Sequence, residues 1–166
     1  MPRIPFHPPV ATRLGRRLAP LVATRARGWF FVHVANPIDR VLIPATKGKF
    51  RMSLDMPSVL LNHRGAKTGL ERTTPLIYFS DGDDIVLLGS NGGSPRHPAW
   101  YHNVSRNPDV TLSNGRFSGH YRGREADGDD RERLWRSACE LYPGYTTYQR
   151  RAGSRRIPVM VFSSLE

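Results

Sequence analysis

The sequence predicts an α+β fold in which about six antiparallel strands form a barrel or curled sheet, with two to four helices packed outside. Three observations lead to this class. Short apolar runs are joined by tight turns, which is typical of β-hairpins. Helical periodicity is confined to brief stretches between these runs. The 14 prolines and 15 glycines argue against a plain helical bundle, while 166 residues suffice for one ordinary core.

A basic N-terminal segment, residues 1–35, precedes the predicted barrel domain at residues 36–166. Several prolines among the first residues prevent a helix from starting there. Residues 10–27 alternate leucines with arginines, a pattern typical of a short helix that lies on an anionic membrane surface or on a partner. A solvated helix face is the alternative, and Pro20 weakens the helix.

In the first half of the barrel domain, Asn36 and Pro37 predict the start of a short apolar helix that packs on the core. Three antiparallel strands should follow, because short apolar runs alternate with glycine-containing turns. The helix is predicted at residues 38–45, the strands at residues 59–63, 72–79 and 84–88, and the turns at residues 64–70 and 81–83.

The second half of the domain again alternates helices with strands. The acidic side chains of Asp127, Asp129 and Asp130 are interpreted as caps of a helix N-terminus, which favours negative charge, and not as a catalytic cluster. Pro143 and Gly144 should terminate that helix. The predicted elements are a helix at residues 98–106, strands at residues 110–112 and 117–125 around an Asn114-Gly115 turn, a helix after residue 130, and a last strand at residues 157–162.

The net charge of +11 results from 25 Lys and Arg residues against 14 Asp and Glu residues. Such a surface attracts anions, namely nucleic acid, an anionic membrane or a small ligand with phosphate and carboxylate groups. No run reaches the roughly 18 apolar residues of a spanning helix, and arginines interrupt any signal-peptide pattern. Because Cys139 is the single cysteine, we expect a cytoplasmic protein, peripheral on the inner face of the membrane if residues 10–27 bind lipid.

Residues 88–103 carry the clearest functional signal. Three glycines follow an apolar run, so that backbone N–H groups can face a ligand, and aromatic and amide side chains come next. Locally, this pattern fits a cofactor-binding loop and a plain strand-to-helix connection equally well.

Gly65-Ala66-Lys67-Thr68-Gly69 is a glycine-flanked turn without the glycine spacing of a nucleotide-binding loop. Its backbone donors, together with Lys67 and Arg72, predict a site for phosphate or carboxylate oxygens. A solvated turn is the alternative.

Neither a metal site nor a serine nucleophile is predicted. His97 and His102 are five residues apart, and no carboxylate flanks them at ligand spacing. The serines lack the Gly-x-Ser-x-Gly turn of hydrolases.

Tyr142, Tyr145 and Tyr148 are spaced by three residues after a predicted helix end. One or two of them suit the core and another suits a pocket mouth, since buried tyrosines keep the hydroxyl solvated or hydrogen-bonded. A phenol at a pocket can orient a substrate carbonyl or donate its proton, and we predict this role for Tyr145.

Five motifs follow one another between about residue 59 and the end of the chain. They are Gly65-Ala66-Lys67-Thr68-Gly69 with Arg72 and Pro75, Ser90-Asn91-Gly92-Gly93, His97-Pro98-Ala99-Trp100-Tyr101-His102-Asn103 with Asn107-Pro108, Tyr142-Pro143-Gly144-Tyr145, and Arg156-Ile157-Pro158-Val159. Together they resemble the actinobacterial deazaflavin-dependent nitroreductase family. The resemblance implies a split β-barrel, similar to flavin-binding pyridoxamine oxidases, and coenzyme F-420 as hydride carrier.

The resemblance also implies roles for individual residues. The tail of the coenzyme would be held by Ala66, Lys67, Thr68 and Arg72, and its length would be followed by Thr73, Thr74, Pro75, Leu76 and Ile77. The ring would lie against Leu88, Gly89, Ser90 and Asn91, and it would be enclosed by Ala99, Trp100, Tyr101, His102 and Asn103. The substrate would meet Tyr142, Tyr145 and Tyr148, with Tyr145 as the catalytic residue. The family often has an arginine where this chain has Ala66, and Arg64 is the candidate replacement.

The sequence therefore predicts an oxidoreductase, a monomer or homodimer, that uses reduced F-420 to transfer a hydride to an apolar, electron-poor acceptor. Quinones, nitro compounds and conjugated enones are the candidate acceptors. No catalytic nucleophile is required, because the coenzyme carries the chemistry. The alternatives are a barrel that binds FMN and, third, a nucleic-acid-binding module. The last is disfavoured because the aromatic residues cluster while the arginines scatter.

Overall fold

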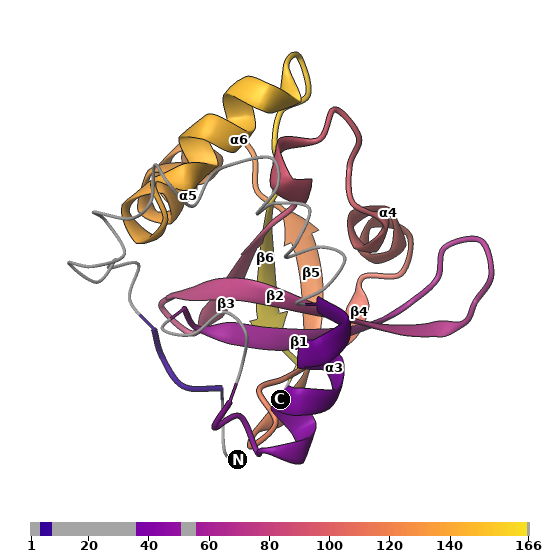
Figure 1. The fold of residues 1–166 in the computed structure, drawn as a ribbon. Coiled ribbons are helices and arrows are strands. Elements are labelled where there is room, and N and C mark those ends of the chain that lie inside the picture. The colour runs from indigo at the N-terminus through magenta and orange to yellow at the C-terminus, as the bar shows by residue number, and fades with distance from the viewer. Residues whose placement is uncertain (1–3, 8–35, 51–55, 166) are drawn as a thin grey trace.

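The computed structural model describes residues 4–7, 36–50 and 56–165 of the chain. The strands of this part are β1 (Ser58–Arg64), β2 (Glu71–Asp81), β3 (Asp84–Leu88), β4 (Asp109–Ser113), β5 (Ser118–Glu125) and β6 (Val159–Ser164). They close into an antiparallel barrel in the neighbour order β1-β2-β3-β6-β5-β4 (Figure 1). This architecture confirms the predicted α+β class with its six-stranded barrel.

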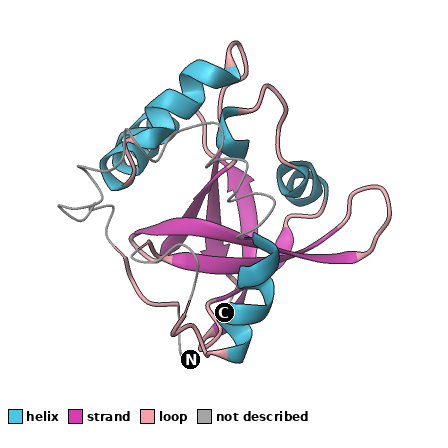
Figure 2. Ribbon diagram, in the orientation of Figure 1, coloured by secondary structure: helices cyan, strands magenta, loops and turns pink. Residues whose placement is uncertain are grey.

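The helices lie outside the strands (Figure 2). They are α3 (Asn36–Ala45), α4 (Ala99–Arg106), α5 (Gly128–Leu141) and α6 (Gly144–Ala152), with a short 3-10 turn, η2 (Asn91–Gly93), after β3. In Figure 1, α5 and α6 lie together above the barrel and α3 lies below it. Within the described residues, no helix has the length and apolar character needed to cross a membrane. The predicted surface helix at residues 10–27 lies outside the described residues.

Tight hairpins set the register of the barrel. β1–β2, β2–β3 and β4–β5 are hairpins, as the sequence predicts. β6 comes last in the chain and inserts between β3 and β5, where Val161 pairs with Val86 and Met160 pairs with Glu125. Leu61 of β1 pairs with Leu112 of β4 and so closes the barrel.

Alternation along the strands divides the buried side chains into two clusters. On β3, Leu87 belongs to the cluster that fills the barrel together with Leu61 and Phe162. Its neighbours Val86 and Leu88 point the other way, into the cluster shared with α5 and α6. The candidate site adjoins this second cluster, because Leu88 also lines its cavity.

Helix α6 is absent from the sequence prediction, which ends the preceding helix at Pro143 and Gly144. That ending is confirmed, because α5 ends at Leu141, but the same pair also leads directly into α6. Proline suits the first position of a helix, and the Pro143 carbonyl oxygen accepts the Thr146 N–H at 3.3 Å and the Thr146 hydroxyl at 2.8 Å. Gly144 is required because a Cβ there would collide with the ring of Tyr142.

The acidic residues at the start of α5 make fewer capping hydrogen bonds than predicted. Asp127 occupies the N-cap position of α5 but makes no side-chain hydrogen bond to the helix. The Asp130 carboxylate instead pairs with Arg124 at 3.1 Å and with Arg133 at 2.8 Å. Asp130 therefore acts mainly in ion pairs at the surface, whose contribution to stability is small.

Helix α3 forms as predicted but packs on the core with few residues. Ile43 is 2% exposed and Asp39 is 4% exposed, whereas Ile38 and Val41 are 42% and 71% exposed. The expected apolar packing therefore holds for one face of the helix. That face brings Asp39 and Arg40 to the cavity described next.

Candidate functional site

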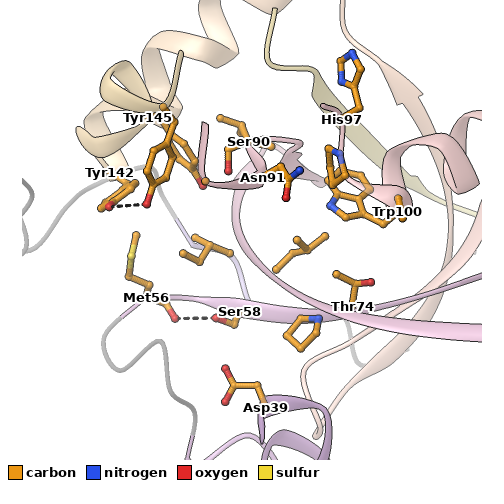
Figure 3. A pocket seen from close by; sticks show the side chains of 18 of the residues that line it. Asp39, Met56, Ser58, Thr74, Ser90, Asn91, His97, Trp100, Tyr142 and Tyr145 are labelled. Atoms are coloured by element: carbon orange, nitrogen blue, oxygen red, sulfur yellow. Dashed lines mark hydrogen bonds between the residues drawn. The ribbon is translucent and has the colours of Figure 1, made fainter. Parts of the chain in front are cut away.

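A cavity of about 380 Å³ lies between β2, the loop after β3, the start of α4 and the tyrosines around α6 (Figure 3). Its volume is in the usual range of small-molecule sites. Its lining residues are Asp39, Arg40, Met56, Ser58, Thr74, Pro75, Leu76, Ile77, Leu88, Ser90, Asn91, Gly92, His97, Pro98, Ala99, Trp100, Tyr142, Tyr145 and Tyr148.

The loop after β3 turns sharply against α6. Asn91, Gly92 and Gly93 have φ angles of 48°, 61° and 81°, in the left-handed region that favours glycine. A Cβ at Gly93 would lie 2.9 Å from the carbonyl oxygen of Tyr148, so the loop and α6 are in backbone contact there. Asn91 and Gly92 line the cavity, and the first N–H groups of a helical turn have no partner within it. The loop thus offers bare backbone to a ligand.

Arg155, between α6 and β6, holds this loop from behind. Its guanidinium donates to the carbonyl oxygens of Gly89 at 3.0 Å, Ser90 at 2.7 Å and Ser94 at 2.8 Å. The side chain is 9% exposed, and burial lowers the pKa of Arg155 from its usual value. The rigid fork of a guanidinium is suited to several carbonyl groups at once. No local motif marks Arg155 in the sequence, since its partners lie 61 to 66 residues away.

Aromatic side chains close the α4 end of the cavity. Trp100 is 5% exposed and lines the cavity. His97 stacks on Tyr101, with 4.6 Å between the ring centroids. Burial and then the charge of Arg155 lower the pKa of His97, so its imidazole is neutral at pH 7. This end of the cavity is therefore aromatic and uncharged.

The predicted tyrosine cluster closes the opposite end (Figure 3). The rings of Tyr142 and Tyr145 meet edge to face at 5.2 Å between centroids. The hydroxyl oxygens of Tyr142 and Tyr148 are 3.4 Å apart. Burial is the main cause that raises the pKa of both Tyr142 and Tyr145, so these phenols keep their protons at neutral pH. Among the described residues, the Tyr145 hydroxyl has no hydrogen-bond partner.

The glycine-flanked turn joins β1 to β2 outside the cavity. The Gly65 N–H donates to the Leu70 carbonyl oxygen at 2.8 Å. A Cβ at Gly65 would lie 2.6 Å from Thr68 Oγ1 and 3.4 Å from Arg72 Nε, so glycine lets both side chains fold over the turn. Lys67 and Arg72 are exposed cations. The turn therefore combines exposed positive charge with a compact backbone.

Buried hydrogen bonds connect this turn to the cavity. The Ala66 N–H donates to Asn103 Oδ1 at 2.8 Å, and Asn103 Nδ2 lies 3.1 Å from His63 Nδ1. His63 Nε2 lies 3.0 Å from Thr74 Oγ1. Burial, followed by the charges of Arg72 and Arg40, lowers the pKa of His63 to about 4.

The structure brings together many, but not all, of the residues predicted for the site. Those that line the cavity are Thr74, Pro75, Leu76, Ile77, Leu88, Ser90, Asn91, Ala99, Trp100, Tyr142, Tyr145 and Tyr148. Ala66, Lys67 and Thr68 lie in the turn, whereas Arg72 and Thr73 line a separate groove of about 700 Å³.

Four further predicted residues, all from the segments next to the cavity, do not line it. Gly89 packs against Pro158, the Tyr101 hydroxyl donates to Glu125 at 2.7 Å, His102 is exposed, and Asn103 is buried behind the cavity wall.

Some residues that line the cavity were not predicted from the sequence. Asp39, Arg40, Met56 and Ser58 come from α3 and from the start of β1, far from the motifs. His97 and Pro98 belong to the motifs but were assigned no contact, whereas Gly92 was expected to present backbone to the ring and does line the cavity. In the described parts of the chain, no three His, Cys, Asp or Glu side chains gather in a way that could hold a metal ion.

A family model described as F420H(2)-dependent quinone reductase matches residues 40–164. The chain belongs to this family. Over 143 residues it is 44% identical to an F420H(2)-dependent quinone reductase of Mycobacterium tuberculosis strain H37Rv, and the match covers 81% of this chain and 95% of the relative. Membership makes the protein a reductase that depends on F-420H2, with F-420 as its coenzyme.

Solved structures agree with this assignment. An F420-H2 dependent reductase (FDR-A) is 38% identical with a TM-score of 0.59, covering 64% of this chain and 94% of that chain. A second solved structure, whose description says only that it is a domain-swapped dimer, is 36% identical with a TM-score of 0.62, covering 76% of this chain and 94% of that chain. The quinone reductase family therefore combines the predicted coenzyme with the observed barrel.

Proposed function

We propose that the protein binds F-420H2 in the cavity and reduces an apolar, electron-poor acceptor, namely a quinone, a nitro compound or a conjugated enone. The main support is the composition of the cavity wall. It combines the bare backbone of Asn91 and Gly92, the apolar side chains of Leu88 and Trp100, and a protonated phenol at Tyr145. Such a wall fits a flat, mainly apolar ring system.

The chain would position the coenzyme through contacts of different kinds. Backbone from Leu88 to Asn91 would lie against the ring, and Trp100 would cover it from α4. When bound, the coenzyme supplies the hydride, so the protein has to orient it and exclude water. Arg155 would keep the loop in the shape that the ring requires, because it binds three of the loop's carbonyl groups.

The anionic tail would bind at the turn, with Lys67 and Arg72 as its charge partners. Ala66 would contribute position but no donor, because its N–H is already bonded to Asn103. Arg64, at the end of β1, is exposed and remains the candidate for the charge that Ala66 lacks.

The acceptor would enter beside the tyrosines. Tyr145 would donate a proton to the reduced acceptor, since its phenol lines the cavity and is protonated at neutral pH. Water is the alternative proton source. Met56 lines the same region, and its flexible thioether can adapt to acceptors of different shape.

Two solution experiments test the function. In the first, purified protein is titrated with F-420 and, separately, with FMN, and ring fluorescence is followed. We expect a saturable change at micromolar F-420 and a much weaker one with FMN. In the second, quinones, nitroaromatics and enones are compared as acceptors with F-420H2. An absence of saturable F-420 binding would contradict the proposed site, and turnover of none of the three classes would contradict the proposed acceptors.

Assembly and membrane contact are part of the same proposal. One solved relative is described as a domain-swapped dimer, so both monomer and homodimer are tested by analytical ultracentrifugation. Binding of residues 10–27 to lipid is tested by co-sedimentation with anionic vesicles, using a variant that lacks these residues as the control.

A further inference from the structure

The hydrogen-bonded chain from Ala66 to Thr74 links four separate segments. It runs from the turn through Asn103 on α4 and His63 on β1 to Thr74 on β2. Asn103 and His63 are 8% and 5% exposed. Because buried polar groups are costly unless they are hydrogen-bonded, this chain has a defined arrangement of donors and acceptors.

The donor directions follow from the Ala66 end. A backbone N–H can only donate, so the Asn103 side-chain oxygen is the atom that faces Ala66. The amide NH2 of Asn103 must then face His63, and an NH2 group only donates. His63 Nδ1 is therefore the acceptor and carries no proton. In a neutral imidazole the single proton is then on Nε2, and Nε2–H donates to Thr74 Oγ1.

The Thr74 hydroxyl hydrogen has to point elsewhere, because His63 already supplies the hydrogen in their shared bond. Among the described residues, His63 is the one hydrogen-bond partner of the Thr74 side chain. Thr74 is half-buried and lines the cavity. Within the described part of the chain, the hydroxyl is thus a donor without an acceptor at the edge of the ligand site.

We infer that Thr74 donates a hydrogen bond to an acceptor atom of the bound coenzyme, and that His63 and Asn103 are positioning residues that fix this direction. The inference rests on the proposed function, because it requires the coenzyme to occupy the cavity. A hydroxyl has one hydrogen to donate and two lone pairs to accept with, and because His63 donates to one lone pair, the hydrogen of Thr74 is left for another acceptor. An oxygen or unprotonated nitrogen of the ligand next to Thr74 would accept this hydrogen.

The donor and acceptor directions of the hydrogen bonds from Ala66 to Thr74 are tested on the wild-type protein without ligand. A two-dimensional spectrum of protein labelled with 15N-histidine distinguishes the two neutral tautomers of each imidazole. We expect His63 to be in the Nε2-protonated form at pH 7, with Nδ1 unprotonated. A His63 found in the Nδ1-protonated form, or charged at pH 7, would overturn the inference without affecting the proposed function.

The donor role of Thr74 is tested by the dissociation constant for F-420, measured by ring fluorescence. Thr74→Val removes the hydroxyl at nearly constant shape and should raise Kd by about 3- to 10-fold, as expected for one hydrogen bond. Thr74→Ser keeps the hydroxyl and should restore Kd to within about twofold of the wild type. The matched control is Thr46→Val just after α3, which also removes a hydrogen-bonded threonine hydroxyl, here one that donates to the Leu42 carbonyl oxygen at 2.7 Å, and which lines neither the cavity nor the groove. Its Kd should equal that of the wild type.

The outcomes separate the inference from the function on which it rests. Equal Kd values for Thr74→Val and the wild type would overturn the donor role and leave the proposed site intact. A Thr74→Ser variant as weak as Thr74→Val would overturn it too, because shape and not the hydroxyl would then matter. A wild-type protein that does not bind F-420 would remove the proposed function itself, whichever tautomer His63 adopts.

Discussion

At the scale of single residues, Tyr145 carries the chemical part of the proposal. Tyr145→Phe removes the proton donor but keeps the ring that packs against Tyr142. We expect kcat for quinone or nitro reduction to fall on the order of tenfold or more, with little change in F-420 affinity. Because burial raises the pKa of Tyr145, ionisation of this phenol should not reduce the activity of the wild type below about pH 10.

Tyr142→Phe is the comparison for this prediction. Its hydroxyl faces that of Tyr148 at 3.4 Å, whereas the Tyr145 hydroxyl has no hydrogen-bond partner among the described residues. A smaller effect on kcat is therefore expected for Tyr142→Phe. If both variants turned over at the wild-type rate, water would be the proton source and the catalytic role of Tyr145 would be wrong.

His63 makes the stability of the protein depend on pH. Its folded pKa of about 4 lies below the ordinary value of 6.5, because burial and the nearby Arg72 and Arg40 disfavour the charged form. Between pH 6.5 and pH 4 the unfolded chain binds a proton that the folded chain does not. The contribution of His63 is thus present above pH 6.5 and is lost as the pH falls toward 4.

Urea unfolding from pH 8 to pH 4 measures this effect. The free energy of unfolding of the wild type should decrease more over the acidic range than that of His63→Gln, which has no titrating group at this position. Taking the difference between the two proteins removes the contribution of other groups, such as His97. Parallel curves would show that His63 has an ordinary pKa in the folded protein.

At the scale of elements, the contact between the loop after β3 and α6 shapes the cavity. Gly93→Ala places a Cβ 2.9 Å from the Tyr148 carbonyl oxygen at a φ of 81°, so α6 must shift. Gly82→Ala has a similar φ of 58° in the β2–β3 turn but meets no atom within 4 Å. We expect Gly82→Ala to cost about 1 kcal/mol of stability, from backbone strain alone, and Gly93→Ala to cost more and to weaken F-420 binding.

Thermal unfolding and F-420 titration of the two variants check this prediction. Equal losses of stability, with unchanged F-420 affinity in both, would mean that the loop and α6 are not tightly coupled. Such a result would contradict the proposal that the backbone of this loop and the tyrosines around α6 form one binding site.

The same elements show what the sequence could predict. The hairpins around Gly82 and Gly115 follow from local turn chemistry, so their strands were expected in nearly the right place. Helix α6 was missed because Pro143-Gly144 resembles a helix end and the apolar pattern beyond it is short. The contact of Gly93 with Tyr148 joins residues 55 positions apart, and no local pattern reports such a distance.

At the scale of the whole molecule, the net charge of +11 attracts anionic ligands and makes molecules of the protein repel one another. If Lys67 and Arg72 bind the tail, added salt should weaken F-420 binding several-fold between about 0.05 and 0.5 M NaCl, because ions screen exposed charges. Lys67→Ala and Arg72→Ala should each weaken binding by a few kcal/mol at most and reduce this salt dependence.

Lys49→Ala serves as the control, because it removes one exposed charge just after α3 and away from the turn. Its affinity for F-420 should match that of the wild type. Normal binding by both Lys67→Ala and Arg72→Ala would show that the tail lies elsewhere.

The parts of the site that come from contiguous motifs were predictable from the sequence. The loop at residues 88–91 and the three tyrosines were expected to share a ligand, and the fold brings them to one cavity. No sequence pattern indicated Asp39 or Arg155, because each reaches the site through tertiary packing and belongs to no motif. Tertiary contacts also explain why Asn103 does not line the cavity: its side chain is hydrogen-bonded to Ala66 and His63 behind the wall.

The most direct test of the account is a crystal structure of the protein with F-420 bound. We predict electron density for the ring between Trp100 and Tyr145, against the backbone at residues 88–91, with the first anionic groups of the tail next to Lys67 and Arg72. Density for the ring in the groove around Asn62 and His120, with the cavity filled by solvent, would contradict the central claim.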